Sequence, residues 1–318
     1  MKIISVVGAR PNFMKIAPFV KAIQAHNASN PHASIHHILA HTGQHYDVRM
    51  SEAFFRSLGI PDPDINLEIG SGSHAEQVGN TMIAFEKVLI QERPDWVVVV
   101  GDVNATLACS VAAKKLCIKV CHIEAGLRSG DMTMPEEVNR LVTDRLSDLL
   151  LTPDILSSQN LRDEGVPEER IRFVGNIMID TLEANRDKAA GLELGQIVSD
   201  NALFPSQRPT AFERYAVLTM HRPSNVDKPE VLGPILDFLT TEVAADMPVI
   251  WPIHPRTQKM LQNFGLWDKA VACESLFLLH PIGYHEMLRL NMQADIMLTD
   301  SGGLQEECCV LGTPCLTL

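Results

Sequence analysis

The chain has 318 residues, and at roughly 150 residues per domain this length favours two domains. Hydrophobic residues make up 46% of the sequence and charged residues 21%, which is ordinary for a folded globular protein and excludes a disordered one. The 27 basic and 39 acidic residues give a net charge of -12 without any basic tract, which argues against a nucleic-acid partner. An anionic small ligand is still compatible, because a few Arg and His side chains dominate the field within a screening length of about 8 Å.

Apolar runs are too short for a membrane helix, and the cysteines lack the spacing of a metal site. The longest purely apolar run is 96–100, whereas a membrane helix needs about 20 residues. Residues 2–7 resemble a strand rather than a secretory signal, so we expect a cytoplasmic protein without a membrane partner. No C-x-x-C pair occurs among the seven cysteines, so we expect buried thiols and neither a metal nor a cofactor.

Strand-like apolar runs alternate with helix-length amphipathic segments, a pattern typical of parallel α/β sheets. In chain order we predict strands at 3–7, 34–40, 96–100, 119–123, 148–151, 216–220, 249–253, 294–298 and 314–318. Helical segments lie between most of them, for example 105–116 and 136–147, and 175–200 also has a helical pattern. We therefore predict two Rossmann-like domains, residues 1–174 and 175–318.

Polar residues follow nearly every predicted strand. In parallel sheets the ligand lies at the carboxyl ends of the strands, so these residues are the candidate site. They form the segments 8–12, 41–45, 101–102, 124–128, 221–223, 254–257 and 300–303. Two such edges facing each other would form an interdomain cleft.

Three acidic residues are candidates for acid–base chemistry. Asp102 and Glu124 each directly follow a buried strand, although either could instead cap a helix or satisfy loop amides. Glu136 follows a proline at a helix start, where acidic residues are also favoured structurally. Arg140 lies four residues further on, so a simple ion pair with Glu136 is an alternative, and Val138 and other apolar residues (Leu141, Val142 and Leu149) are expected to form the buried stripe of this helix.

The second half carries candidates for phosphate binding. His221 projects at a strand end beside Arg222, and His254 with Arg256 is a weaker case; a single histidine is more often structural. The segment 300–307 leads from a strand through two glycines into a helix, so backbone amides there could cradle a phosphate, the alternative being a ligand-free turn. Arg10 could add a second phosphate contact, and its segment is not the G-x-G-x-x-G fingerprint of dinucleotide binding.

Taken together, these motifs resemble the non-hydrolysing UDP-N-acetylglucosamine 2-epimerases over nearly the whole chain. The resemblance rests on the ordered segments 8–11, 42–45, 101–106, 122–128, 135–140, 220–222, 300–307 and 312–314. It implies a glycosyltransferase-B-like pair of domains with the UDP-sugar in the cleft between them. It also implies roles for individual residues: catalysis for Asp102, Glu124, Glu136 and His221, phosphate or other substrate contacts for Arg10, Arg140, His221, His254, Ser301, Gly302 and Gly303, and binding of the ribose hydroxyls for Glu307.

The reaction implied is inversion at C2 of a UDP-N-acetylhexosamine, in a cytoplasmic homodimer that needs no cofactor. The C2 proton is hardly acidic, so its removal is easiest if UDP leaves C1 in the same step, giving a 2-acetamidoglucal. Epimerisation of UDP-diacetamido-glucuronic acid, a hydrolysing epimerase, a UDP-sugar glycosyltransferase and a non-catalytic binder are the alternatives. Members of this family continue beyond the position of Leu318 with an Arg-containing loop and helices, so we expect the second domain to be truncated.

Overall fold

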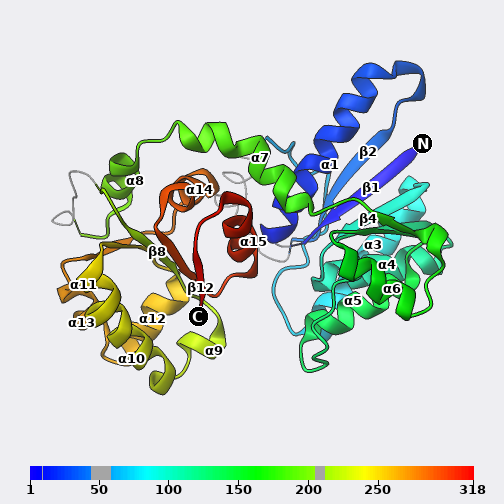
Figure 1. The fold of residues 1–318 in the computed structure, drawn as a ribbon. Coiled ribbons are helices and arrows are strands. Elements are labelled where there is room, and N and C mark those ends of the chain that lie inside the picture. Colours follow the sequence, from blue (N-terminus) through cyan, green and yellow to red (C-terminus); the bar gives the residue numbers. More distant parts are fainter. Residues whose placement is uncertain (9, 44–58, 205–211) are drawn as a thin grey trace. The chain divides into compact units, whose positions relative to one another are not determined.

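The computed structural model describes residues 1–8, 10–43, 59–204 and 212–318. They divide into two compact units, Met1–Thr181 and Leu182–Leu318, and the division falls within α7 (Ile177–Ala190). Each unit is an α/β domain built on its own parallel sheet (Figure 1). The predicted fold class of two Rossmann-like, parallel-sheet domains is thereby confirmed. Gln44 and His45 of the predicted 42–45 motif lie outside the described residues.

A seven-stranded parallel sheet forms the centre of unit 1, with the order β3-β2-β1-β4-β5-β6-β7. Its strands are β1 (Lys2–Val7), β2 (His36–His41), β3 (Ile65–Asn66), β4 (Trp96–Val100), β5 (Lys119–Ile123), β6 (Leu149–Thr152) and β7 (Ile171–Phe173). The central strand β1 pairs with β2 on one side, from Lys2 opposite His36 to Val7 opposite His41, and with β4 on the other. The chain therefore builds the sheet outward from β1 in one direction and then in the other.

Helices cover both faces of this sheet. They are α1 (Arg10–Ser29), α3 (His74–Glu92), α4 (Asn104–Lys115), α5 (Pro135–Leu146) and α6 (Ile155–Asp163), with short 3-10 turns at η1 (Pro31–Ala33) and η2 (Glu168–Arg170). Phe85 of α3 and Cys109 of α4 pack in the core on one face, and Phe19 of α1 and Ile177 of α7 pack on the other. Burial on both faces explains why these strands are continuous apolar runs rather than alternating ones.

Unit 2 repeats the same plan with five parallel strands in the order β10-β9-β8-β11-β12. The strands are β8 (Ala216–Thr219), β9 (Val249–Pro252), β10 (Leu276–Leu279), β11 (Ile296–Thr299) and β12 (Cys315–Thr317). Relative to its own first strand, β8, unit 2 has the strand order of the first five strands of unit 1, and the order reverses between β8 and β11. Both units therefore have the strand order of a Rossmann domain.

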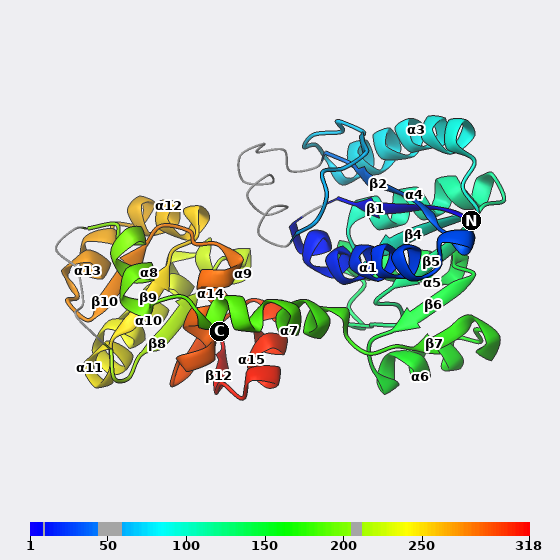
Figure 2. The ribbon, with the colours of Figure 1, turned by 90° about the horizontal axis from the view of Figure 1, so that it is seen from above.

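The helices of unit 2 also lie on both faces of its sheet (Figure 2). They are α8 (Leu194–Asn201), α9 (Pro223–Val226), α10 (Pro229–Phe238), the π-helical turn η3 (Leu239–Val243), α11 (Ala244–Asp246), α12 (Pro255–Asn263), α13 (Trp267–Ala272), α14 (Tyr284–Gln293) and α15 (Gly302–Leu311). Leu236 of α10 and Leu261 of α12 pack on one face. Val198 of α8, Leu290 of α14 and Cys308 of α15 pack on the other.

Helix α5 buries the opposite face from the one predicted. Val138 and Val142 are 39% and 37% exposed, so the predicted apolar stripe is wrong at these two positions. Leu141 is half-buried, and Leu149 lies beyond the helix, in β6, where it packs against the core. The buried face is polar instead, formed by Glu137, Asn139, Thr143 and Asp144. The side chains of Glu137, Asn139 and Asp144 find hydrogen-bond partners in neighbouring loops, which a hydrophobic pattern cannot reveal.

Three strands were not predicted, and part of the cysteine expectation is wrong. The missed strands are β3, β7 and β10, of which the first two are only two and three residues long. Cys117, Cys309 and Cys315 are exposed, whereas buried thiols were expected. Within the described ranges, no group of His, Cys, Asp and Glu side chains could hold a metal ion, and no helix is long and apolar enough to cross a membrane.

Gly126, in the loop after β5, gives a test of this local packing. Its φ is +83°, and a Cβ at this position would lie 2.3 Å from the carbonyl oxygen of Ser157. Gly130 has a similar φ of +71° but open space around it, so it isolates the conformational cost. We expect Gly130→Ala to lower the free energy of unfolding by about 1 kcal/mol, and Gly126→Ala to lower it by at least about 2 kcal/mol more. Urea unfolding measures both variants, and equal losses would contradict this packing.

Candidate active site

In each sheet the strand order reverses at one point, where the helices that follow two neighbouring strands lie on opposite faces of the sheet. Ligands of such folds bind at this point, outside the carboxyl ends of the strands. In unit 1 this point lies between β1 and β4. Asn12 bridges the two strand ends: its Oδ1 accepts from the amide of Gly8 and its Nδ2 donates to the carbonyl of Val100, both at 3.0 Å. The backbone at this point is therefore fixed by a buried side chain.

Glu124 lies beside this point and is paired with a cation. It follows β5 directly, and its φ of +73° is in the left-handed region, where a non-glycine residue is uncommon and often functional. Its carboxylate forms an ion pair with Lys15 of α1. A Cβ built on Gly101 would lie 3.2 Å from Glu124 Oε2 and 3.4 Å from Lys15 Nζ, so all three groups meet where β4 ends.

Asp102, the residue after Gly101, belongs to a second ion-pair network. Arg140 of α5 donates from Nη2 to Asp102 Oδ2 (2.5 Å) and from Nη1 to Glu137 Oε2 (2.9 Å). Burial alone would raise the pKa of Glu137, but hydrogen bonds from the amides of Ser129 and Gly130 and from Arg140 outweigh it and lower the pKa to about 2. Arg140 is thus held in place by a permanent carboxylate while it contacts Asp102.

Two of the structural alternatives for these residues are wrong. Asp102 does not cap α4, because the residue at the N-cap is Val103 and no side chain caps the helix. The partner of Arg140 on its own helix is Glu137, three residues away, rather than Glu136. Glu136 is half-buried on the first turn of α5 and takes part in none of the ion pairs found in the described part of the chain. Arg10 is the first residue of α1, and its side chain lies outside the described part of the structure.

In unit 2 the strand ends are joined by the buried carboxylate of Asp300, which follows β11. Its Oδ2 accepts from the amides of His221 (2.8 Å) and Arg222 (2.7 Å), and its Oδ1 lies 2.9 Å from His221 Nδ1. Burial raises the pKa of Asp300, yet the hydrogen bonds from His221 and Arg222 outweigh this and bring the pKa down to about 2. An ionised Asp300 fixes a proton on Nδ1, so Nε2 of the half-exposed ring is left to act on a ligand.

His254 lies next to His221, with the ring centroids 5.5 Å apart. It is the N-cap of α12, and its Nδ1 accepts from the amide of Arg256 at 3.2 Å. An accepting Nδ1 places the proton of the neutral ring on Nε2, which makes His254 a hydrogen-bond donor. The neighbouring guanidinium of Arg256 is occupied by Asp227.

The start of α15 leaves backbone amides unused. Ser301 is the N-cap, and its side chain makes no capping hydrogen bond. A Cβ added to Gly302 or Gly303 would meet nothing within 4 Å, so the backbone there is open to close approach. The first amides of a helix lack intrahelical partners and favour an anion.

Glu307, one turn further along α15, is a buried carboxylate of a different kind. Only 4% of its surface is exposed, and burial raises its pKa to about 7, although the neighbouring hydroxyl of Tyr284 acts to lower it. A carboxyl group in this state is readily ionised by a ligand that donates hydrogen bonds to it.

Sequence reasoning missed Lys15 and Glu137 as parts of this site. Lys15 stands alone among the apolar residues 13–17, and a cation in such a segment was the available signal. Glu137 is adjacent to the predicted Glu136, and only the helical spacing to Arg140 distinguishes the two. Lys15 pairs with a residue distant in sequence, Glu124, and Glu137 lies on the face of α5 that the hydrophobic pattern placed in water.

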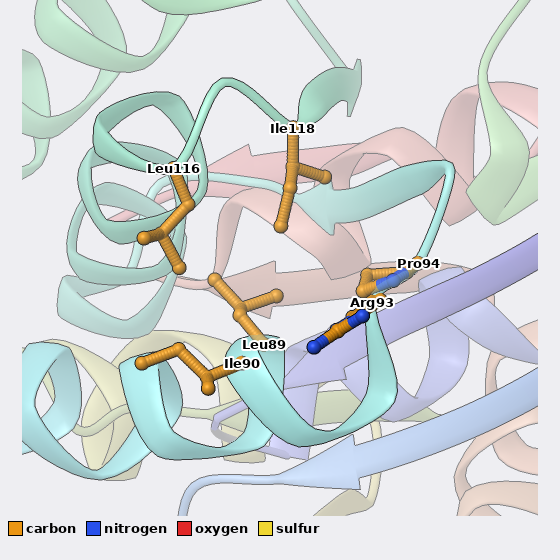
Figure 3. A pocket seen from close by; sticks show the side chains of 6 residues that line it. All are labelled: Leu89, Ile90, Arg93, Pro94, Leu116 and Ile118. Atoms are coloured by element: carbon orange, nitrogen blue, oxygen red, sulfur yellow. The ribbon is translucent and has the colours of Figure 1, made fainter.

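A hollow elsewhere in unit 1 has a different character. It has a volume of about 310 Å³ and is lined by Leu89, Ile90, Arg93, Pro94, Leu116 and Ile118 (Figure 3). These residues end α3 and α4 and precede β4 and β5, at the edge of the sheet opposite the carboxylates. Its lining contains no acid or base other than Arg93, so it offers no acid–base chemistry.

Known proteins resemble this chain over its whole length. The family model described as UDP-N-acetylglucosamine 2-epimerase matches residues 27–318. The UDP-N-acetylglucosamine 2-epimerase of Methanocaldococcus jannaschii is 42% identical over 100% of this chain and 83% of its own, and the UDP-2,3-diacetamido-2,3-dideoxy-D-glucuronate 2-epimerase of Pseudomonas aeruginosa is 37% identical with the same coverage.

Solved structures agree with the sequence matches. The crystal structure of the Methanocaldococcus jannaschii enzyme in complex with UDP-GlcNAc and UDP has a TM-score of 0.86 at 41% identity, covering 100% of this chain and 84% of that one. The Neisseria meningitidis UDP-GlcNAc 2-epimerase bound to UDP-GlcNAc has a TM-score of 0.85 at 30% identity, covering 100% and 82%. By sequence and by fold alike, this chain belongs to the UDP-N-acetylglucosamine 2-epimerase family.

Proposed function

We propose that this protein is an isomerase that inverts C2 of UDP-N-acetylglucosamine to give UDP-N-acetylmannosamine without hydrolysis. The observation that carries the proposal is the meeting of Glu124, Lys15 and Gly101 at the carboxyl edge of the unit 1 sheet, with Asp102 next in sequence. Two carboxylates, each paired with a cation, supply candidate groups for proton transfer at carbon. Membership of the epimerase family supports the choice of substrate.

The reaction proceeds by elimination and re-addition. A carboxylate takes the C2 proton while the C1–O bond breaks, UDP leaves with the electron pair, and a C1=C2 double bond forms. The UDP oxygen then attacks C1 as a second group delivers a proton to the opposite face of C2. Electrons balance without an oxidant or reductant, and inversion requires acid–base groups on both faces of the sugar.

The groups of unit 1 fit the proton transfers. Glu124 and Asp102 are the leading acid–base pair, and Glu136, named by the family resemblance, is the third candidate. Lys15 pairs with Glu124 and Arg140 with Asp102, so each leading carboxylate has a cation beside it during proton transfer.

The groups of unit 2 fit the leaving UDP. The amides of Gly302 and Gly303 and the hydroxyl of Ser301 bind phosphate at the start of α15, where the helix dipole favours negative charge. His254 adds a donor from its Nε2, His221 donates from its Nε2 when the ring is an imidazolium, and with Arg10 they stabilise the charge that develops on the diphosphate. Glu307 accepts hydrogen bonds from the ribose hydroxyls.

A related sugar nucleotide is the second candidate substrate. The Pseudomonas aeruginosa relative acts, by its name, on UDP-2,3-diacetamido-2,3-dideoxy-D-glucuronate and matches this chain over its full length. Both sugars have an acetamido group at C2, so the same proton transfers serve either one. Epimerisation rates measured in parallel on UDP-N-acetylglucosamine and on this diacetamido sugar nucleotide identify the substrate as the one with the higher kcat/KM.

We also propose a homodimer, in line with the resemblance. Val138 and Val142 are exposed on α5 in the single chain, and exposed apolar surfaces are often buried in protein–protein interfaces. Light scattering that gives the mass of one chain at micromolar concentration would contradict this assignment.

The assay for the proposed reaction is proton NMR of UDP-N-acetylglucosamine in deuterated buffer. We expect deuterium at C2 and the manno isomer to appear, whereas free N-acetylmannosamine would indicate a hydrolysing enzyme and the absence of any epimer would favour a glycosyltransferase. Glu124→Gln should slow C2 exchange by about 10²–10⁴-fold, because the base is lost, while UDP binding stays within about twofold. Glu86→Gln, an exposed change on α3, is the matched control. Exchange at the native rate in Glu124→Gln would remove Glu124 from the role of base.

The raised pKa of Glu307 predicts a pH-dependent affinity. The ligand-free protein keeps this carboxyl protonated below pH of about 7, whereas ribose hydroxyls bind the ionised form, so affinity for UDP-N-acetylglucosamine should rise with pH and level off above about 7. Calorimetry in buffers of different ionisation enthalpy should detect the released proton. In Glu307→Gln this component should vanish, and the difference between the two proteins separates Glu307 from other titrating groups. An identical pH dependence in both proteins would contradict the prediction.

A further inference from the structure

Unit 1 contains a buried ion pair that the proposed reaction does not use directly. His122 lies on β5 and Asp144 on the buried face of α5, and each side chain is 1% exposed. His122 Nδ1 and Asp144 Oδ1 are 2.6 Å apart. Burying two ionisable groups costs free energy of desolvation, so the groups that the pair binds are of interest.

The partners of His122 determine its protonation. Its Nε2 lies 2.8 Å from the carbonyl oxygen of Gly101, which can only accept, and its Nδ1 faces the carboxylate of Asp144, which also accepts. Both ring nitrogens therefore carry protons, and the ring is an imidazolium. Burial lowers the pKa of His122, but the charge and hydrogen bond of Asp144 outweigh it, with a further contribution from Glu124, so the pKa is raised.

Asp144 is saturated with donors. Its Oδ2 accepts from the amide of Gly126 at 3.0 Å and from Arg128 Nη1 at 2.7 Å, while Oδ1 faces His122. Arg128 continues outward to Glu164, which receives its Nε and Nη2 at 2.7 Å. The carboxylate thus connects β5, α5 and the loop between them.

The two backbone positions held by the pair flank the candidate catalytic residues. The carbonyl bound by the His122 ring belongs to Gly101, immediately before Asp102. The amide bound by Asp144 belongs to Gly126, two residues after Glu124. A single buried pair therefore ties together the two loops from which the leading carboxylates project.

We infer that His122 and Asp144 are positioning residues for the proposed epimerisation, holding the backbones of Asp102 and Glu124 at the separation that proton transfer requires. The inference rests on the proposed function and extends it to residues that touch neither the sugar nor UDP. Their loss should reduce kcat and leave the binding of UDP to unit 2 unchanged, because small displacements of catalytic groups affect the chemical step most.

The test compares two neighbouring isosteric changes. Asp144→Asn keeps the side-chain shape but removes the charge that holds the His122 imidazolium, and we expect kcat for C2 exchange to fall by about tenfold or more with KM within about twofold. Glu164→Gln breaks only the outer end of the same chain at Arg128 and should leave kcat within about twofold. A folded Asp144→Asn protein with native kcat would overturn the inference, as would an equal loss in both variants.

Spectroscopy on the native protein gives a readout independent of catalysis. In nitrogen-15 spectra of histidine-labelled protein, we expect one imidazolium that stays protonated above pH 7 and disappears in Asp144→Asn. A neutral His122 at pH 7 would overturn the inference even if Asp144→Asn failed to fold. Absence of epimerisation by the native protein, with the imidazolium present, would instead count against the proposed function alone.

Discussion

The reversal of strand order in each sheet is the constraint on which the candidate site depends. In unit 1 the chain crosses from β2 and β3 back past β1 to β4, and unit 2 makes the same crossing between β8 and β11. The helices that follow the two neighbouring strands lie on opposite faces of the sheet, so no connection crosses over the carboxyl ends of these strands. One buried polar side chain bridges the ends in each unit, Asn12 in unit 1 and Asp300 in unit 2.

The chemistry of unit 1 is arranged through pairs of opposite charge. Glu124 with Lys15, Asp102 with Arg140, and Asp144 with His122 each place a carboxylate and a cation together, and the pair of Asp144 and His122 is almost wholly removed from water. A carboxylate removed from water without such a partner would take up a proton and cease to be a base. For Asp144, burial alone would raise the pKa, but the charges and hydrogen bonds of His122 and Arg128 outweigh it and lower the pKa.

Glu307 in unit 2 shows the opposite arrangement. It is also buried, yet the hydroxyl of Tyr284 does not offset the effect of burial, and its pKa rises to about 7. Asp300, a few residues earlier, receives backbone amides and a histidine ring, and its pKa falls to about 2. Two carboxylates close in sequence thus serve different purposes. Asp300 accepts hydrogen bonds from groups of the protein, whereas Glu307 has the capacity to accept hydrogen bonds from a ligand.

Much of this organisation could be predicted from the sequence. The alternation of apolar runs and amphipathic segments predicted two parallel-sheet domains, and the polar residues after the strands predicted where Asp102, Glu124, His221 and Ser301 would lie. The pattern failed where burial is not apolar. On α5 it favoured Val138 and Val142 for the core, but the buried face carries Glu137 and Asp144, whose partners are loop amides and a histidine on another element.

By itself, the sequence determined the fold class and the chemical groups at the strand ends, because both follow from local periodicity and from the direction of parallel strands. Only the tertiary structure decided which cation meets which carboxylate. Lys15 and Glu124 are 109 residues apart, and no local pattern relates them. Their pairing results from the way α1 and the loop after β5 pack around the end of β4, where the free energy of burying one charge depends on the presence of the other.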